Sequence, residues 1–225
     1  MKNIDHICVI VQARLGSERI PNKMLKSFAG TTLFENIINI IQNTKLAKNN
    51  FYVSVFEQEL KDIANNKNIK IFHRSKKSAE SEGIDIKEIY EWWDKLPFTY
   101  VILVNGCNPF LKPETIDKFI LQYINSNNDG MFGVINKKNY FWNKNGNLLT
   151  PWPNTEVMNT KRVGDTYEAA HCLYASRLDT IGKGNWMGDL NDIVLYPMDN
   201  FEVFDIDYQW QFDMSEEMYK KLKKI

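Results

Sequence analysis

The sequence predicts an α/β fold with a mostly parallel, Rossmann-like sheet flanked by helices. Short apolar runs typical of strands alternate with segments whose apolar residues recur at helical spacing. The runs are apolar throughout instead of at every second residue, which is typical of strands buried on both faces. With 225 residues, 44 % of them hydrophobic, the chain is long enough to enclose one core of this kind.

Four segments are expected to form the first strands, because each is a short apolar or β-branched run. They lie at residues 6–12, 51–56, 69–73 and 100–105. Three helices are expected from apolar stripes at helical spacing. They lie at residues 31–44, 84–96 and 112–125. The first helix follows a Thr cap, and the last begins near Pro113, which is a residue favoured in the first turn of a helix.

The pattern loosens from about residue 130 into short strands separated by turn signals such as NKNGN and PWPN. Regular structure is expected again at residues 168–177 and 203–207. A final amphipathic helix is expected from about Trp210 to Lys224.

One domain is expected over residues 1–225, because no repeat, low-complexity tract or convincing linker divides the chain. Residues 136–166 are interpreted as an irregular excursion from that domain. The excursion carries aromatic and proline side chains but is too irregular to form a core of its own, so it needs a partner surface. These side chains are Tyr140, Phe141, Trp142, Pro151, Trp152 and Pro153.

Charge and cysteine content exclude some partners. Lys plus Arg and Asp plus Glu both number 28, so no net field is expected to attract nucleic acid or a membrane surface. Cys8, Cys107 and Cys172 show neither a disulfide framework nor a C-x-x-C spacing. The N-terminus lacks the pattern of a signal peptide, and no stretch approaches the ~20 apolar residues that span a bilayer. We therefore expect a cytoplasmic protein that binds any anion locally.

The apolar run Ile7–Val11 stops abruptly at a polar, cationic loop with the sequence QARLGSERIPNK. This loop combines fixed cations, short hydrogen-bond donors and a glycine at which the backbone can approach an anion, as a triphosphate requires. The residues concerned are Arg14, Gly16, Ser17, Asn22 and Lys23. The loop matches neither the P-loop nor the dinucleotide-binding pattern. Taken alone, it is equally compatible with phosphate binding and with a solvated basic loop.

Asp205 and Asp207 are separated by one residue on an expected strand, which places both carboxylates on the same face. Two carboxylates on one side suit Mg²⁺, which fills its remaining positions with water and substrate phosphate. An isolated D-x-D is also typical of the polar face of an edge strand. The cationic loop on the same chain favours the metal, because nucleotidyl transfer requires both features.

Three blocks, taken in order, resemble the bacterial CMP-sialic acid synthetases and their relatives, the CMP-Kdo synthetases and other cytidylyltransferases. The first, VIVQARLGSERIPNKML, is similar to the family signature I-P-A-R-x-G-S-K-G-x-P-x-K-N. The second, VILVNGCNPFLKPETID, lies where the family has L-Q-P-T-S-P-L-R, with Pro109 as the anchor. The third, FEVFDIDYQWQFDMSEEM, resembles the closing D-I-D-x-x-x-D-F segment.

The resemblance implies a sheet of the nucleotide-diphospho-sugar transferase type with a small β-rich dimerisation excursion, and therefore a homodimer. It implies that CTP is bound by a set of loop and strand-end residues. These are Arg14, Gly16, Ser17, Asn22, Lys23 and Arg74. On sequence alone, Arg74 is equally compatible with an ordinary surface arginine.

The resemblance also implies catalytic and metal-binding roles. Lys23 and Arg14 are expected to act in catalysis together with Asp207, with Lys23 stabilising charge on the α-phosphate or the departing pyrophosphate. Asp205 and Asp207 are expected to hold Mg²⁺, which orients the acceptor oxygen for in-line attack at the α-phosphorus.

Six residues are expected to contact an acidic acceptor. They are Asn105, Cys107, Asn108, Lys161, Arg162 and His171. Simpler alternatives stay open for four of them. Cys107 suits a space-filling thiol, His171 a hydrogen-bonded core histidine, and Lys161 and Arg162 solvated loop charges.

The chain departs from the family pattern at both ends of the expected site. Glu18 and Arg19 replace a Lys-Gly pair, which reverses one charge and moves a cation to the next position. Residues 105–108 replace Q-P-T-S, and Leu111 stands where an arginine is common. The expected function is Mg²⁺-dependent transfer of CMP from CTP to a nonulosonic acid or similar acidic sugar, in surface glycan biosynthesis. Transfer to a phosphonate or phosphate monoester and a non-catalytic nucleotide-binding role remain alternatives.

Overall fold

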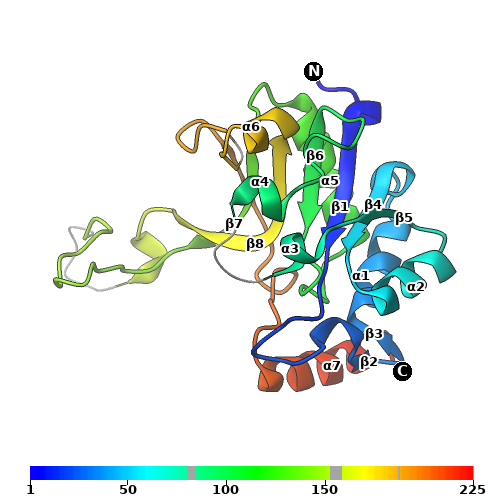
Figure 1. Cartoon of the computed structure of the whole chain (residues 1–225). Helices are drawn as coiled ribbons and strands as arrows, with labels where there is room; N and C mark the ends of the chain where they lie inside the picture. The colour runs from blue at the N-terminus through cyan, green and yellow to red at the C-terminus, as the bar shows by residue number, and fades with distance from the viewer. Residues whose placement is uncertain (81–84, 153–158, 187, 225) are drawn as a thin grey trace.

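The computed structural model describes residues 1–80, 85–152, 159–186 and 188–224, and these contain the expected α/β fold (Figure 1). At its centre is a seven-stranded sheet in the order β5-β4-β1-β6-β8-β7-β9. The strands are β1 (Ile7–Gln12), β4 (Phe51–Val55), β5 (Lys70–His73), β6 (Tyr100–Val104), β7 (Met131–Lys137), β8 (Thr166–Arg177) and β9 (Val194–Pro197). In this described sheet β8 runs antiparallel to both neighbours and every other pair is parallel, which confirms the expected mostly parallel arrangement.

Several helices begin where the sequence signals predict. Helix α1 (Leu33–Gln42) starts with a capping box between Thr32 and Glu35, in which each side chain accepts a hydrogen bond from the other's backbone N–H. Helix α5 (Pro113–Asn125) has its proline in the first turn, where the missing N–H costs nothing. The final amphipathic helix, α7 (Gln209–Lys223), is confirmed.

The remaining elements are short. They are α2 (Gln58–Asn66), α3 (Lys76–Ala79), α4 (Ile86–Ile89), α6 (Leu178–Gly182), the two-stranded pair β2 (Ser27–Phe28) and β3 (Thr31–Thr32), and the 3-10 turns η1 (Ile4–His6), η2 (Lys23–Leu25), η3 (Ala47–Asn50) and η4 (Thr160–Arg162).

Strand β1 is buried on both faces, as its unbroken apolar sequence predicts. Val9 and Val11 belong to the larger core, which includes the apolar faces of α1 and α5. Cys8 and Ile10 belong to a smaller cluster with Trp92 on the other side of the sheet. Burial on both faces fixes the carboxyl end of β1, and with it the start of the loop that follows.

The helix expected over residues 84–96 is mostly absent, and this prediction is wrong. Within the described residues only α4 is helical, after a cap in which Asp85 accepts a hydrogen bond from the N–H of Lys87. Turns follow, and they carry Trp92 into full burial, where its Nε1–H donates to Oε1 of Gln12 at 2.9 Å. This tertiary hydrogen bond and the burial of the indole outweigh the helical spacing. Ile84 lies outside the described residues.

The strand expected at residues 203–207 is also absent, because this segment makes no ladder with the sheet. It docks instead on the loop after β6. The N–H of Ile206 donates to the carbonyl of Cys107 at 3.1 Å, and Nδ2 of the fully buried Asn108 donates to the carbonyl of Val203 at 3.0 Å. Strand geometry therefore does not place the carboxylates of Asp205 and Asp207 on one face, contrary to the expectation from the sequence.

The segment interpreted as an excursion forms an arm that projects from the body of the molecule (Figure 1). Its base is the antiparallel pair of β7 and β8, and an isolated bridge joins Trp142 to Leu148 farther out. Trp152 stacks on Tyr140 with ring centroids 4.7 Å apart, yet half of the Trp152 surface remains exposed. Pro153 and the rest of residues 153–158 lie outside the described residues.

In the part of the chain that the structure covers, no helix is both long enough and apolar enough to cross a membrane.

Gly182, at the end of α6, provides a test of the packing behind the sheet. A β-carbon there would lie 2.3 Å from the Trp93 ring, which is bulky and half-buried. We expect Gly182→Ala to lower the melting temperature by about 3–8 °C, because the ring must shift. Gly164→Ala is the matched control, since no atom lies within 4 Å of its new methyl group. Thermal unfolding followed by circular dichroism measures both, and equal melting temperatures would contradict the packing described.

Candidate active site

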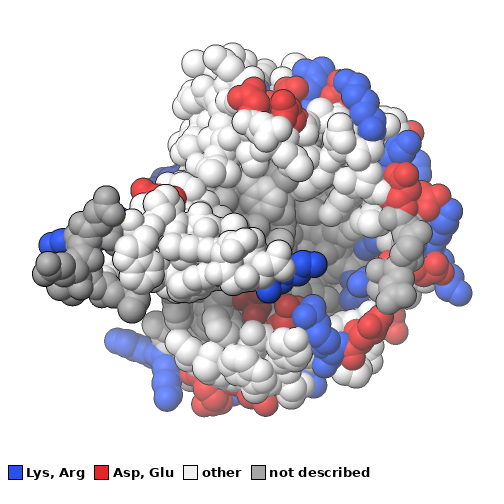
Figure 2. Space-filling view, turned by 90° about the vertical axis from the view of Figure 1, so that its left-hand side faces the viewer, with Lys and Arg blue, Asp and Glu red and all other residues white. Residues whose placement is uncertain are grey.

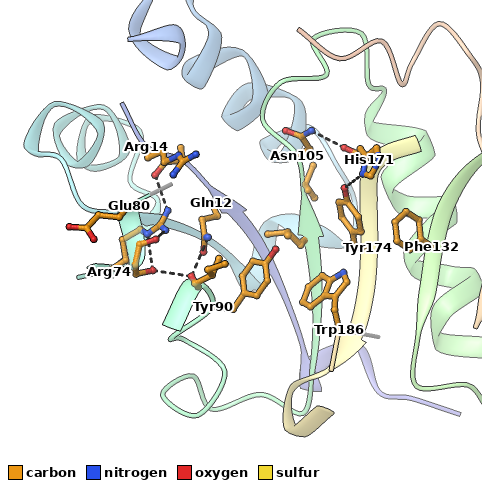
Figure 3. Close-up of a pocket in the computed structure, with 15 residues that line it drawn as sticks. Gln12, Arg14, Arg74, Glu80, Tyr90, Asn105, Phe132, His171, Tyr174 and Trp186 are labelled. Carbon is orange, nitrogen blue, oxygen red and sulfur yellow. Dashed lines mark hydrogen bonds between the residues drawn. The ribbon is translucent and has the colours of Figure 1, made fainter. Parts of the chain in front are cut away.

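Two adjoining pockets lie at the carboxyl ends of β1 and β6, where open parallel sheets bind ligands. Their volumes are about 530 Å³ and about 480 Å³. They meet at the end of β1, because Gln12, Ala13 and Arg14 line both. Figure 3 shows the larger one, with Arg14 and Arg74 on one side and His171, Tyr174 and Trp186 on the other.

The smaller pocket is lined by residues of the cationic loop. Gly16, Ser17 and Lys23 line it as expected, together with Arg19 and Cys107. Asn22 does not: it is exposed, adopts a left-handed conformation with φ 53°, and precedes η2. An asparagine tolerates this conformation better than most residues, so its place in the described structure is to turn the loop.

Lys23 connects the loop to the segment before α7. Its Nζ donates to the carbonyl of Ile206 at 2.5 Å and lies 3.9 Å from Oδ1 of Asp207. Only 11 % of its side chain is exposed. The ammonium group is therefore held in one place, at the floor of the pocket that the loop encloses.

Asp205 and Asp207 lie close enough for their charges to interact, although no strand aligns them. Burial, and next the negative charge of Asp207, raise the pKa of Asp205 to about 6. Oδ1 of Asp205 is buried without a hydrogen-bond partner among the described residues. Asp207 forms an ion pair with Arg19, with Nη2 and Oδ1 2.7 Å apart.

These two carboxylates suit a hard divalent cation. An unpartnered, buried carboxylate oxygen beside a second carboxylate is a donor set that Mg²⁺ accepts, and it needs no third protein ligand when water and phosphate complete the shell. The described residues hold no group of three or more His, Cys, Asp or Glu side chains suited to a metal.

Arg74 is buried, so its description as an ordinary surface arginine is wrong. Its guanidinium donates to Oγ and the carbonyl of Ser78 and, at 3.4 Å, to the carbonyl of Ala13. Burial, and next the nearby charge of Arg14, lower the pKa of Arg74 to about 10. Arg74 thus fixes the residue that follows β1 through its hydrogen bond to Ala13, and it also lines the larger pocket.

Asn105 and His171 lie together on the opposite side of the larger pocket. Nδ2 of Asn105 donates to the carbonyl of His171 at 2.7 Å, and Nδ1 of His171 lies 3.1 Å from the Tyr174 hydroxyl. The backbone of His171 has φ 49° and lies beside a β-bulge between β7 and β8. Its side chain is exposed and lines the pocket, so the alternative of a hydrogen-bonded core histidine is wrong. A left-handed histidine in a strand is uncommon, and such strain is typical of functional sites.

An aromatic wall completes this side of the pocket, and the sequence did not reveal it. Trp186 stacks on Tyr90 with centroids 4.8 Å apart, and Phe132 contacts Tyr174 edge-on at 4.8 Å. These four rings come from four separate parts of the chain: the turn after α4, β7, β8 and the segment beyond α6. No local pattern connects them, so only the fold brings them together. Figure 2 shows a face of the molecule that is hollowed beside the arm, with both positively and negatively charged side chains near the hollow.

Other expected acceptor contacts have different surroundings. Burial raises the pKa of Cys107 to about 11, so it is a neutral thiol in the wall of the loop pocket. Asn108 is fully buried and holds Val203, so the structure does not bring it to either pocket. Lys161 and Arg162 are exposed on η4 of the arm, and neither lines either of these two pockets.

Comparison with known proteins identifies similar sequences and a similar fold. The family model described as "Cytidylyltransferase" matches residues 8–224. The chain is 29 % identical over 139 residues to a 3-deoxy-manno-octulosonate cytidylyltransferase of Rickettsia bellii, covering 60 % of this chain and 54 % of that protein. It is 25 % identical over 131 residues to the spore coat polysaccharide biosynthesis protein SpsF of Bacillus subtilis, covering 56 % and 53 %. The matches therefore span about half the length of these relatives.

Among solved structures, CMP:2-keto-3-deoxy-manno-octonic acid synthetase, determined with CTP, superposes with a TM-score of 0.70. The alignment covers 96 % of this chain and 99 % of that one, at 12 % sequence identity. At this identity the likeness shows a shared fold.

Asp205 gives a prediction that needs no ligand. Its raised pKa means that the folded protein loses stability as the pH rises from about 4 through about 6, where Asp205 ionises in the folded state. We expect Asp205→Asn to be more stable than the parent at pH 8 by about 1–2 kcal/mol, and by less at pH 4. Urea unfolding at the two pH values measures this, with Asp94→Asn, at an exposed position, as the control. A variant that is destabilised at pH 8 would contradict the buried, unpartnered carboxylate.

Proposed function

We propose that this chain, which belongs to the cytidylyltransferase family, transfers CMP from CTP to an acidic acceptor and releases pyrophosphate. The family expected from the three sequence blocks is confirmed by the match over residues 8–224. The observation that carries the proposed activity is the fixed ammonium of Lys23, held between Ile206 and Asp207 beneath a loop that also presents Arg14 and Ser17.

In the proposed reaction, the loop binds the triphosphate through its cations and its hydrogen-bond donors. The oxygen of an acceptor hydroxyl attacks the α-phosphorus and loses its proton to water. A new O–P bond forms, and the bond from the α-phosphorus to the bridging oxygen breaks to release pyrophosphate. Lys23 stabilises the negative charge that grows on the phosphates. Asp205 and Asp207 would hold Mg²⁺, which neutralises phosphate charge when bound.

The acceptor is proposed to occupy the larger pocket, between Asn105, His171 and the aromatic wall. An acidic sugar such as a nonulosonic acid presents both polar groups and an apolar ring face, which aromatic side chains can cover. A role in surface glycan biosynthesis is consistent with relatives named for 3-deoxy-manno-octulosonate and for spore coat polysaccharide. The free thiols of Cys8, Cys107 and Cys172 fit a reducing compartment such as the cytoplasm.

Two alternatives rest on this chain's own departures from the family pattern. The neutral thiol of Cys107 and the Arg19–Asp207 ion pair are compatible with a protein that binds nucleotide without turnover. A phosphonate or phosphate monoester would replace the acidic sugar as the acceptor. Pyrophosphate release from CTP in the presence of Mg²⁺, measured over a panel of sugar acids, phosphonates and phosphate esters, distinguishes the proposed function from these two alternatives.

We further propose that the chain is a homodimer through its arm. Trp142, Leu149 and Trp152 are 54 %, 65 % and 48 % exposed, which is unusual for such large apolar side chains on one segment. Pairing of two arms would cover them. In that arrangement Lys161 or Arg162 would lie near the acceptor site of the partner, although neither lines the two pockets described for its own chain.

Lys23→Ala tests the proposed catalytic lysine. We expect kcat for pyrophosphate release to fall by on the order of a hundredfold or more, and CTP binding to weaken, because the lysine acts on charge that grows toward the transition state. Lys45→Ala, which removes an exposed lysine beyond α1, is the matched control. If kcat and CTP binding of Lys23→Ala equal those of the parent, the loop is a solvated basic segment without a catalytic role.

The arm gives a separate prediction for assembly and acceptor selection. Light scattering should report a dimer at micromolar concentration, and a fully active monomer would refute the arm-mediated assembly. Lys161→Gln and Arg162→Gln should raise the KM for the acceptor more than the KM for CTP, because an acidic acceptor needs a cation on its own side. If both KM values change equally, these cations do not select the acceptor.

A further inference from the structure

Helix α7 presents a stripe of apolar side chains to solvent, although its other face is docked on the body of the molecule. On the docked face, Phe212 and Tyr219 contact Phe28 edge-on, with ring centroids 5.7 and 5.2 Å apart. On the solvent side, four large apolar side chains recur at every fourth residue, so each lies only about 40° around the helix from the one before. They form the α7 stripe: Trp210, Met214, Met218 and Leu222, each between 36 % and 61 % exposed.

The charged side chains beside the α7 stripe are sorted by sign along the helix. Asp213 and Glu217 flank its first half, Lys221 and Lys224 flank its second half, and all four residues are exposed. The stripe therefore has an acidic end and a basic end.

Two of these charges are not balanced within the described part of the chain. Lys220 pairs with Glu216 and Glu217 on its own helix, whereas neither Asp213 nor Lys221 forms an ion pair among the described residues. Asp213 accepts a hydrogen bond only from the uncharged amide of Gln209. Eight residues of helix separate Asp213 from Lys221, which is about 12 Å, so the two cannot pair with each other.

We infer that α7 pairs in antiparallel orientation with α7 of a second copy of this chain. With a two-fold axis at the middle of the stripe, Trp210 packs against the partner's Leu222 and Met214 against the partner's Met218. In the same arrangement Asp213 comes within reach of the partner's Lys221. Because the interface is symmetric, each of these contacts forms twice.

The distribution of charge favours a second copy over other occupants of the α7 stripe. An anionic membrane or a nucleic acid would attract Lys221 and Lys224 but would be repelled by Asp213 and Glu217 on the same face. Parallel pairing of two α7 helices would place like charges beside each other. In the antiparallel pair, each half of the stripe meets charges of the opposite sign.

The contact is expected to be weak by itself. Helix α7 has 15 residues and is about 22 Å long, so one pair of these helices buries less than the roughly 1,200 Å² of a standard protein interface. The helix lies along the lower edge of the molecule, whereas the arm projects from another side (Figure 1). The inference therefore depends neither on the proposed function nor on the arm-mediated dimer, and the α7 pair would join two such dimers where they form.

Sedimentation velocity over a range of protein concentrations measures this association. We expect the species present at about 1 µM to double in mass at concentrations on the order of 100 µM, as suits a small interface. Asp213→Lys or Lys221→Asp should weaken this step by about fivefold to twentyfold, because each change places like charges together twice in the interface. The variant that carries both changes should recover most of the association, since the pair is restored with its charges exchanged. Lys118→Asp, on an exposed position of α5, is the matched control and should change nothing.

Recovery in the double variant separates pairing from damage to the fold, because a destabilised helix would not be repaired by a second charge reversal. Absence of the larger species, lack of recovery in the double variant, or an equal effect of Lys118→Asp would overturn the inference.

Two controls identify the occupant. Trp142→Ser with Trp152→Ser, in the arm, should leave the α7 step in place, and loss of that step would show that it runs through the arm instead. Flotation with phosphatidylglycerol vesicles should leave the parent unbound. Vesicle binding that strengthens in Asp213→Lys would identify an anionic membrane as the occupant and overturn the pairing.

Discussion

The hydrogen bond from Lys23 to the carbonyl of Ile206 is the interaction on which the site depends. It joins the loop after the first strand to the segment before the last helix, two parts of the chain that are 183 residues apart. The same segment is tied to the loop after β6 through Ile206 and Cys107, so three loops are fixed around one lysine. Because the ammonium is already held, little reorganisation is needed when charge develops nearby, which is the condition for effective electrostatic catalysis.

The two aspartates show what the proposed arrangement costs in stability. Burial raises the pKa of Asp205, and its Oδ1 has no hydrogen-bond partner among the described residues. A carboxylate in such surroundings destabilises the fold when it is ionised. Packing alone gives no reason to keep such a group. A cation that arrives with the substrate would turn the same repulsion into binding free energy, and in its absence Arg19 supplies part of the missing charge. The cationic loop and the acidic segment are therefore best understood as one electrostatic unit.

Sequence alone located the sheet and the loop, because strands buried on both faces leave an unbroken apolar run that ends where the loop begins. It failed where tertiary contacts decide the local structure. Burial of Trp92 and its hydrogen bond to Gln12 outweigh the helical spacing around it. Asn108 binds the carbonyl of Val203, so residues 203–207 dock on the loop after β6 instead of pairing as a strand. The aromatic wall around Trp186 could not be predicted either, because its members meet only after β8 and the chain beyond α6 have folded.

A crystal structure of the protein with CTP and Mg²⁺ tests the central claim most directly. The account predicts the triphosphate within the loop of residues 14–23, with Lys23 at the phosphates and the metal held by Asp205 and Asp207. A nucleotide bound elsewhere, or a triphosphate in this loop with the metal remote from both aspartates, would contradict it.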